Sequence, residues 1–300
     1  MGKGRATWAA LLLCAVLMLA LIALVHRRRQ PNLGRVQSLV DDFALAQRST
    51  VILLVDPACD PPGSTSSAGV VRFKTLNQVL PAVRQTPEGV PILLVMHVRG
   101  GYTDILATLA AVLSGHRGPV LAMIPYYALS GGTLLALAAD EVWMGPSASV
   151  GHVDPQLSVA APGGAGSAED SYYAASDTVA SRDAAVSLRD RVTVAAARRA
   201  IETTYATTLQ MLEGRGAYGD DHARLTRLAG TLAAGKEPGM HSAPIDKRAA
   251  VRLLAPAFRS DREPPSEVYA MVDAAISGCA KKDAVKTPTV YTAVYDASDR

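Results

Sequence analysis

Three short apolar segments, each followed by a stretch with helical periodicity, constrain the fold of this chain more than any other feature. Residues 51–55, 91–98 and 120–125 are nearly uninterrupted runs of aliphatic residues. Runs of this kind are typical of parallel strands that are buried on both faces. Because the segments between them have the length and periodicity of helices, the pattern predicts βαβ units and an α/β fold with a mostly parallel sheet.

The remaining elements follow from the same periodicity. It predicts helices at 36–46, 75–84, 103–113, 131–139, 186–212, 225–234 and 245–254, and a fourth strand at 141–144. Residues 160–167 are rich in alanine, glycine and proline and lack a pattern, which predicts a flexible loop. No internal repeat interrupts this order of elements.

The chain divides into four parts at changes of composition. We expect an N-terminal membrane anchor at 1–30, a lead-in helix and linker at 31–48, one globular domain at 49–258, and an extension at 259–300. The last part is polar and punctuated by proline, so we expect it to be loosely held.

The first part has the properties of a single membrane span. Residues 6–25 contain no charged residue, and about 20 such residues cross a bilayer core of roughly 30 Å. No small-residue cleavage site follows, which favours an anchor over a cleaved signal peptide. The basic cluster at 26–29 outweighs Lys3 and Arg5 on the other side. The positive-inside rule therefore favours a single-pass membrane protein whose domain lies in the cytoplasm.

Composition argues against several other classes of protein. The net charge is +3 and no stretch is basic enough to indicate a nucleic-acid partner. The three cysteines Cys14, Cys59 and Cys279 imply no disulfide framework. The sequence contains no P-loop and no metal-ligand cluster, so we expect no cofactor and no metal.

Ser130 is the leading candidate for chemistry. It stands between an apolar strand and an Ala/Leu-rich helix, and Gly131 and Gly132 follow it directly. Small neighbours of this kind allow the sharp strand-to-helix turn that presents a nucleophilic serine, while N–H groups at the helix start can bind an oxyanion. The alternative is that Ser130 only caps the helix, since serine is a common N-cap.

A second glycine pair strengthens the case for a nucleophile. Gly100 and Gly101 end the preceding strand, as Ser130 and Gly131 follow the next one. The carboxyl ends of neighbouring parallel strands meet at one edge of a sheet. The N–H groups of Gly100, Gly101 and Gly131 could therefore converge beside the Ser130 hydroxyl and form the oxyanion hole of an acyl-transfer enzyme.

Several motifs in this order resemble the serine dehydrogenase proteinase family, a group of Clp-fold, signal-peptide-peptidase-A-like serine proteases. They lie at 97–101, 128–133, 138–141 and 153–157, with a weaker continuation at 240–245. The resemblance implies a Clp/crotonase-like fold, a serine endopeptidase with Ser130 as nucleophile, and an oxyanion hole at the Gly100–Gly101 step. It also implies polypeptide substrates and a homo-oligomer. Arg99 replaces the proline that the family usually has before the glycine pair, and its cation could bind an acidic group or point to solvent.

The general base is harder to assign. Signal-peptide-peptidase-like relatives use a lysine downstream of the serine, but no lysine lies between Ser130 and Lys236. His152 lies near the triad histidine position of the Clp protease proteolytic subunit, although one residue away from it, and Asp154 could orient its ring. Asp154 could instead cap the turn that follows, with His152 a loop histidine beside it. His241 and Lys236 are the alternative bases.

One further histidine is expected to be structural. His97 leads into the glycine pair from a buried strand, so we expect it to be a core histidine with satisfied hydrogen bonds.

Three functions remain open from the sequence. The first is a membrane-anchored serine peptidase that cleaves membrane-associated or partly unfolded polypeptides through a Ser130 acyl-enzyme. The second is a crotonase-like acyl-CoA enzyme in which Ser130 is incidental. The third is a Clp-fold scaffold whose catalytic site has decayed.

Overall fold

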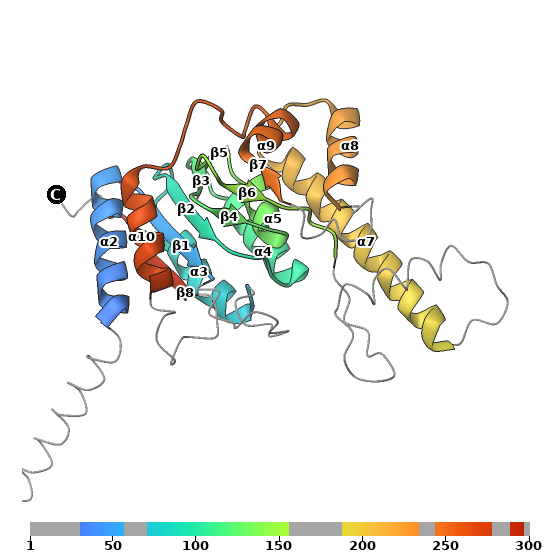
Figure 1. Ribbon diagram of the computed structural model, residues 1–300, viewed down its shortest axis with the longest axis horizontal. Helices are drawn as coiled ribbons and strands as arrows, with labels where there is room; N and C mark the ends of the chain where they lie inside the picture. The colour runs from blue at the N-terminus through green and yellow to red at the C-terminus, as the bar shows by residue number, and fades with distance from the viewer. Residues whose placement is uncertain (1–30, 57–70, 156–187, 234–243, 278–288, 297–300) are drawn as a thin grey trace, which may run out of the picture.

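A five-stranded sheet forms the centre of the structure, which is a computed structural model that describes residues 31–56, 71–155, 188–233, 244–277 and 289–296. The strand order is β5-β3-β2-β1-β8 (Figure 1). The strands are β1 (Thr50–Val55), β2 (Ile92–His97), β3 (Val120–Ile124), β5 (Glu141–Met144) and β8 (Thr289–Ala293). The first four are parallel and β8 runs antiparallel to β1, so the prediction of a mostly parallel α/β sheet is confirmed.

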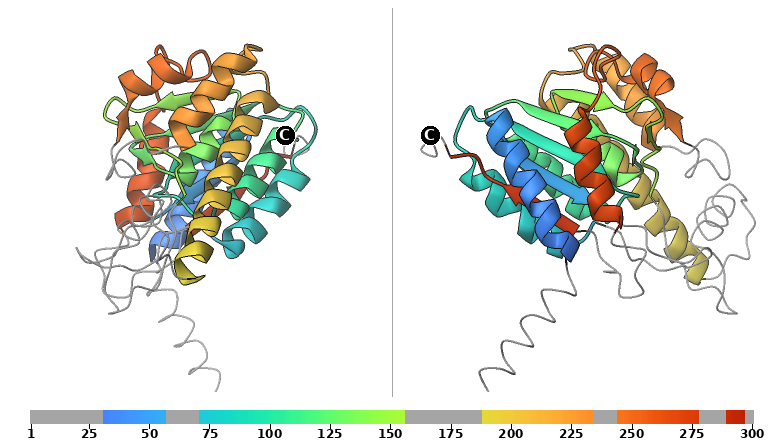
Figure 2. Two further views of the ribbon diagram at one scale, coloured as in Figure 1. Left: turned by 90° about the vertical axis from the view of Figure 1, so that its right-hand side faces the viewer. Right: turned by 60° about the vertical axis from the view of Figure 1, so that its left-hand side comes forward.

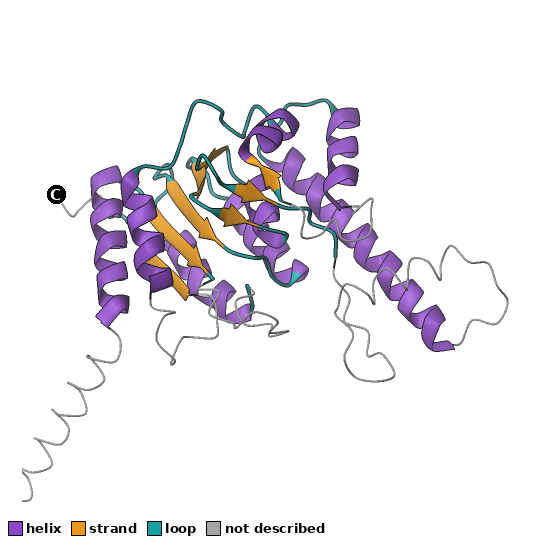
Figure 3. Ribbon diagram, viewed as in Figure 1, coloured by secondary structure: helices purple, strands orange, loops and turns teal. Residues whose placement is uncertain are grey.

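Helices cover both faces of this sheet (Figures 2 and 3). One face carries α2 (Pro31–Gln47) and α10 (Ser266–Ile276), and the other carries α3 (Phe73–Gln85), α4 (Thr103–Ser114) and α5 (Gly131–Leu137). Along β1, Val51, Leu53 and Val55 pack on the first face, while Ile52 and Leu54 pack on the second. Because successive side chains of a strand point to opposite faces, both faces must be apolar, which explains the unbroken aliphatic runs.

A small second sheet and three helices complete the described structure. The sheet consists of β4 (Tyr127–Ala128), β6 (Ser149–Val150) and β7 (Ile245–Asp246), with β4 parallel and β7 antiparallel to β6. The helices are α7 (Leu188–Gly214), α8 (His222–Ala233) and α9 (Lys247–Leu254). A bridge between Val98 and Ala128 joins the end of β2 to β4. The two sheets therefore meet just before Ser130.

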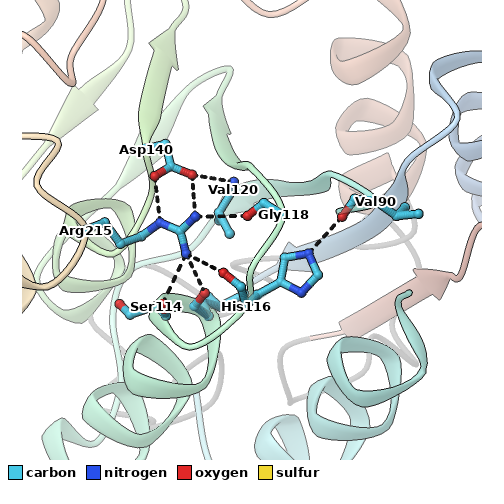
Figure 4. A network of polar contacts seen from close by, with 8 residues as sticks. Val90, Ser114, His116, Gly118, Val120, Asp140 and Arg215 are labelled. Carbon is cyan, nitrogen blue, oxygen red and sulfur yellow. Dashed lines mark hydrogen bonds and ion pairs between the residues drawn. The ribbon is translucent and has the colours of Figure 1, made fainter. Parts of the chain in front are cut away.

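A partly buried ion pair fixes the end of α7 to the face of the sheet that carries α4 and α5 (Figure 4). The Arg215 guanidinium donates from Nε and Nη2 to both carboxylate oxygens of Asp140, at 2.7 and 2.6 Å. Asp140 Oδ2 also accepts from the N–H of Val120 at 2.7 Å. The remaining N–H groups donate to the carbonyls of Leu113, Ser114, His116 and Gly118. One side chain thus ties the end of α7 to the end of α4 and the start of β3.

We predict a loosely held polar extension after Arg259, but the described parts of this segment, 260–277 and 289–296, contain two packed elements. Helix α10 buries Val268, Met271 and Val272 beneath it, and β8 adds a strand to the edge of the main sheet. The segment also packs against α2, which buries Val36 and Val40 and is part of the same core. The polar composition concealed both elements, because each presents only a few apolar residues on one face.

Other expected elements differ only at their ends or cannot be compared. The helix predicted at 245–254 begins two residues later, because Ile245 and Asp246 form β7. The membrane span predicted at 6–25 and the loop predicted at 160–167 lie outside the described residues. Among the helices that are described, none combines the length and apolarity needed to cross a bilayer.

The packing of α10 predicts that its apolar face contributes to global stability. Met271 is fully buried, so Met271→Ala should lower the free energy of unfolding by about 2–5 kcal/mol. Glu267→Gln, on the exposed side of the same helix, should change it by no more than about 0.5 kcal/mol. Urea unfolding followed by circular dichroism measures both. Equal midpoints for the two variants would mean that α10 is not part of the cooperative unit.

Candidate active site

Ser130 occupies a strained turn between β4 and α5. Its φ is 50° and its ψ is −120°, and Ser130 and Arg48 are the two non-glycine residues of the described chain with positive φ. Such a conformation costs of order 1–3 kcal/mol, so the surrounding structure must impose it. Ser130 stands at the N-cap position of α5, yet its side chain makes no capping hydrogen bond. Ser130 therefore occupies the N-cap position that the alternative predicted, but its hydroxyl does not cap the helix.

Thr133, which the sequence analysis did not single out, supports this turn. Its side chain is fully buried, and Oγ1 lies 2.9 Å from the carbonyl oxygen of Ala128 and 2.8 Å from that of Gly151. The same hydroxyl accepts from the Gly151 N–H at 2.9 Å. One hydroxyl therefore joins the strand before Ser130 to the segment that leads to His152.

The two glycine steps predicted to converge lie beside Ser130. Gly100 has φ +133°, and a Cβ on it would come within 3.0 Å of Ser130 Cβ and 3.3 Å of the Gly131 nitrogen. A Cβ on Gly131 would overlap Leu106 Cδ1 and lie 3.4 Å from the Gly101 nitrogen. Only glycine allows backbones to approach this closely. The structure thus brings Gly100, Gly101 and Gly131 together around the serine.

The pairing of this glycine step with Val71 determines where its polar groups point. The Val71 N–H donates to the Gly100 carbonyl at 2.9 Å, and the Tyr102 N–H donates to the Val71 carbonyl at 3.2 Å. Alternate residues of a paired strand face opposite edges, so the N–H and C=O of Gly101 face away from Val71. Neither the Gly101 nor the Gly131 N–H donates to another backbone group of the described chain. The Gly131 N–H is one of the donors that the start of a helix leaves free.

The segment with His152 and Asp154 passes next to Ser130. A Cβ on Gly151 would lie 3.3 Å from the Ser130 nitrogen. His152 is half-buried, and its Nδ1 lies 3.3 Å from the carbonyl oxygen of Thr231 in α8. No hydrogen bond between the described residues joins His152 to the Ser130 hydroxyl. Asp154 is buried.

The alternative bases His241 and Lys236 lie outside the described residues, so their distance from Ser130 stays untested. No metal-binding cluster of His, Cys, Asp and Glu occurs among the residues that are described.

His97 is buried as expected but is not satisfied. It is 6% exposed, and its Nδ1 has no hydrogen-bond partner within the described part of the chain. Its ring packs against Tyr127 at 4.0 Å and edge-on against Tyr126 at 5.6 Å between ring centres. Burial lowers the pKa of His97 from 6.5 to about 4, with the negative charge of Asp273 opposing the shift. The imidazole is therefore neutral near pH 7.

Arg99 neither points simply to solvent nor presents an unpaired cation to the glycine step. Its Nε lies 2.6 Å from Asp56 Oδ2, and its Nη2 lies 3.4 Å from Asp56 Oδ1. Asp56 stands at the carboxyl end of β1, next to the end of β2. The sequence could not have revealed this pair, because the two residues are 43 positions apart.

Comparison with known families identifies one match over almost the entire chain. The model of the ClpP-like SDH-type serine proteinases matches residues 7–294.

Two curated relatives match a shorter part. The uncharacterized proteins MJ1495 and MJ0137 of Methanocaldococcus jannaschii are 42% and 41% identical over 91 residues, which is 29% of this chain. The matches span 31% and 32% of those proteins, about a third of their length.

Solved structures show a weak overall likeness. Two mutant forms of the 1510-N membrane-bound stomatin-specific protease, one of them in complex with a substrate peptide, are 14% and 16% identical to this chain. They cover 63% of it and 74% and 70% of their own chains, with TM-scores of 0.41 and 0.40.

The contact between Gly100 and Ser130 predicts a selective effect of a single methyl group. Gly100→Ala should abolish the reactivity of Ser130 toward a fluorophosphonate, because the new Cβ would press on Ser130 Cβ and displace the turn. Gly89→Ala is the matched control, since Gly89 also has positive φ but open space around its Cα. It should cost about 1–2 kcal/mol of stability and leave the labelling rate unchanged. Equal labelling of both variants would contradict this packing.

Proposed function

The chain belongs to the family of ClpP-like SDH-type serine proteinases, and we propose that it hydrolyses peptide bonds with Ser130 as the nucleophile. One observation carries the proposal. The Ser130 turn is strained, its hydroxyl caps nothing, and the N–H groups of Gly101 and Gly131 lie beside it without a backbone acceptor in the described chain. Strain of this kind persists where a function requires it.

The proposed reaction proceeds through an acyl-enzyme. Ser130 Oγ attacks the carbonyl carbon of the scissile bond, and its proton passes to a general base. The N–H of Gly131 and those of the Gly100–Gly101 step stabilise the resulting oxyanion. The C–N bond then breaks and the base returns the proton to the leaving amine. Water hydrolyses the ester by the same steps and regenerates Ser130.

His152 is the base that the contacts favour. A carbonyl oxygen can only accept, so the contact with Thr231 requires His152 Nδ1 to carry a proton. In the neutral ring this leaves Nε2 as the acceptor, which is the tautomer that a general base needs. Catalytic hydrogen bonds are often formed only in the complex with substrate, so the missing contact with Ser130 does not oppose the assignment. We retain Asp154 as the residue proposed to orient the histidine ring, and His241 and Lys236 as the alternative bases.

The free edge of the glycine step suits an extended substrate. Because the N–H and C=O of Gly101 face away from Val71, a polypeptide could pair with them as an added strand. We propose polypeptide substrates, membrane-associated or partly unfolded, and a homo-oligomeric enzyme without nucleic-acid partner or cofactor. We further propose that residues 6–25 anchor the protein in the membrane as a single span with the catalytic domain on the cytoplasmic side.

Two other functions fit the site less well. A crotonase-like acyl-CoA enzyme would use the same glycine N–H groups, but it would not need a serine in a strained turn. A scaffold with a decayed site would gain nothing from that strain, which costs stability. The uncapped hydroxyl of Ser130 therefore favours the peptidase.

The nucleophile can be tested with a serine-directed probe. Wild-type protein should react with a fluorophosphonate and cleave casein, and Ser130→Ala should lose both activities, because no other hydroxyl can replace the nucleophile. Ser114→Ala is the control, since Ser114 Oγ is a hydroxyl without a hydrogen-bond partner in the described chain and belongs to α4. Labelling that persists in Ser130→Ala would disprove the assignment. An unlabelled wild type that turns over acyl-CoA would favour the crotonase-like function.

The base can be tested by its removal and chemical replacement. His152→Ala should reduce the rate of peptide cleavage by about two to four orders of magnitude while KM changes little. Imidazole in the buffer should restore part of the rate, because it can occupy the vacated space. His222→Ala, at an exposed position paired with Glu213, should behave as wild type. Full activity of His152→Ala would show that His152 is not the general base and would leave His241 and Lys236 as the candidates.

A further inference from the structure

We propose that Asp56 and Arg99 are a positioning pair, which holds the Gly100–Gly101 step against Ser130 in the orientation that the oxyanion hole needs. The inference rests on the proposed function, since it concerns the same site. Neither side chain is assigned a contact with the substrate; both act through the backbone of the residues that follow Arg99.

The pair is built as a fixed contact between two strand ends. Asp56 is 1% exposed. Its Oδ2 accepts from Arg99 Nε at 2.6 Å and its Oδ1 accepts from Arg99 Nη2 at 3.4 Å. The Asp56 N–H also donates to the carbonyl of His97 at 2.7 Å. Asp56 is thus bound to the end of β2 twice, through its backbone before Arg99 and through its side chain at Arg99. A planar guanidinium held by two contacts fixes orientation as well as distance.

The backbone before Arg99 is fixed by hydrogen bonds, so an anchored Arg99 side chain leaves the following glycines less freedom to move. Before Arg99, the Val98 N–H donates to Tyr127 at 3.2 Å and its carbonyl accepts from Leu129 at 2.9 Å. After it, Gly100 adopts φ +133° and lies against Ser130. Glycine at such an angle has great conformational freedom and does not hold this shape by itself. Together with the pairing of Val71, anchoring the side chain of Arg99 restricts the movement by which Gly100 could leave the serine.

Charge compensation explains why a cation is tolerated at this position. Asp56 neutralises Arg99, so the pair adds little net charge beside the serine. The nearby Tyr127 is affected by both charges. Burial and the negative charge of Asp56 raise the pKa of Tyr127 to about 12, while the positive charge of Arg99 opposes this shift. Removing either partner would break the two contacts between the ends of β1 and β2 that this ion pair makes. The arrangement favours a structural pair over an arginine kept available for an acidic ligand.

The test compares Asp56→Asn with a control pair in the full-length protein. Asp56→Asn should lower the rate of fluorophosphonate labelling and kcat for a peptide at least about tenfold, as expected for a misplaced oxyanion-hole donor, while KM changes less than about twofold. The amides of Val71 and Tyr102, which bond across the glycine step, should exchange hydrogen faster than in wild type. Glu88→Gln breaks the exposed ion pair with Arg117 and should change none of these quantities.

Arg99→Lys provides a second variant in case Asp56→Asn does not fold. It keeps the positive charge but cannot make the two-nitrogen contact, so it should show a smaller loss of kcat, again with little change in KM. Unchanged labelling, kcat and amide exchange in the folded variants would overturn the proposal. Because amide exchange does not depend on catalysis, it tests the pair even if the wild type proves inactive, and an unlabelled wild type with faster exchange in Asp56→Asn would refute only the proposed function.

Discussion

The close approach of two backbones at Ser130 is the constraint on which the rest of the site depends. A serine with φ 50° is unfavourable alone, and it is held because Gly100 packs against one side and Thr133 binds the chain on the other. Two parallel strands that end side by side supply these contacts, since Gly100 follows β2 and Ser130 follows β3 through β4. The fold therefore determines the geometry, and the glycines make it sterically possible.

Sequence reasoning succeeded where periodicity or strand order decides the structure. Unbroken aliphatic runs indicate the strands, and the rule that parallel strands share a carboxyl edge places Gly100 beside Ser130 from the sequence alone. It failed where contacts join distant residues of ordinary composition. In the sequence, Asp56 and Arg99 are ordinary charged residues after a strand, and Thr133 is an ordinary threonine in a helix. Nothing in the sequence indicates which groups they contact. The segment with α10 and β8 was misjudged because its few apolar residues are scattered among polar ones.

The strained turn, the proposed positioning pair and the proposed base belong to different parts of the fold. Hydrogen bonds to backbone groups contribute to the placement of each of them. Val71 pairs with the backbone of the glycine step. The Gly151 N–H donates to the Thr133 hydroxyl just before His152, and His152 Nδ1 contacts the Thr231 carbonyl oxygen. Arg215 and Asp140 fix α7 to the face on which α5 begins. The arrangement suits a site that is largely formed before substrate binds, and the proposed base would then approach Ser130 in the complex with substrate.

A crystal structure of the protein after reaction with a phosphonate would test the central claim most directly. The account predicts a covalent bond between phosphorus and Ser130 Oγ, with the phosphonyl oxygen about 3 Å from the Gly131 nitrogen and from a nitrogen of the Gly100–Gly101 step. An adduct on another residue would contradict the account. So would a Ser130 adduct whose oxygen points to solvent, because the glycine N–H groups would then not form an oxyanion hole.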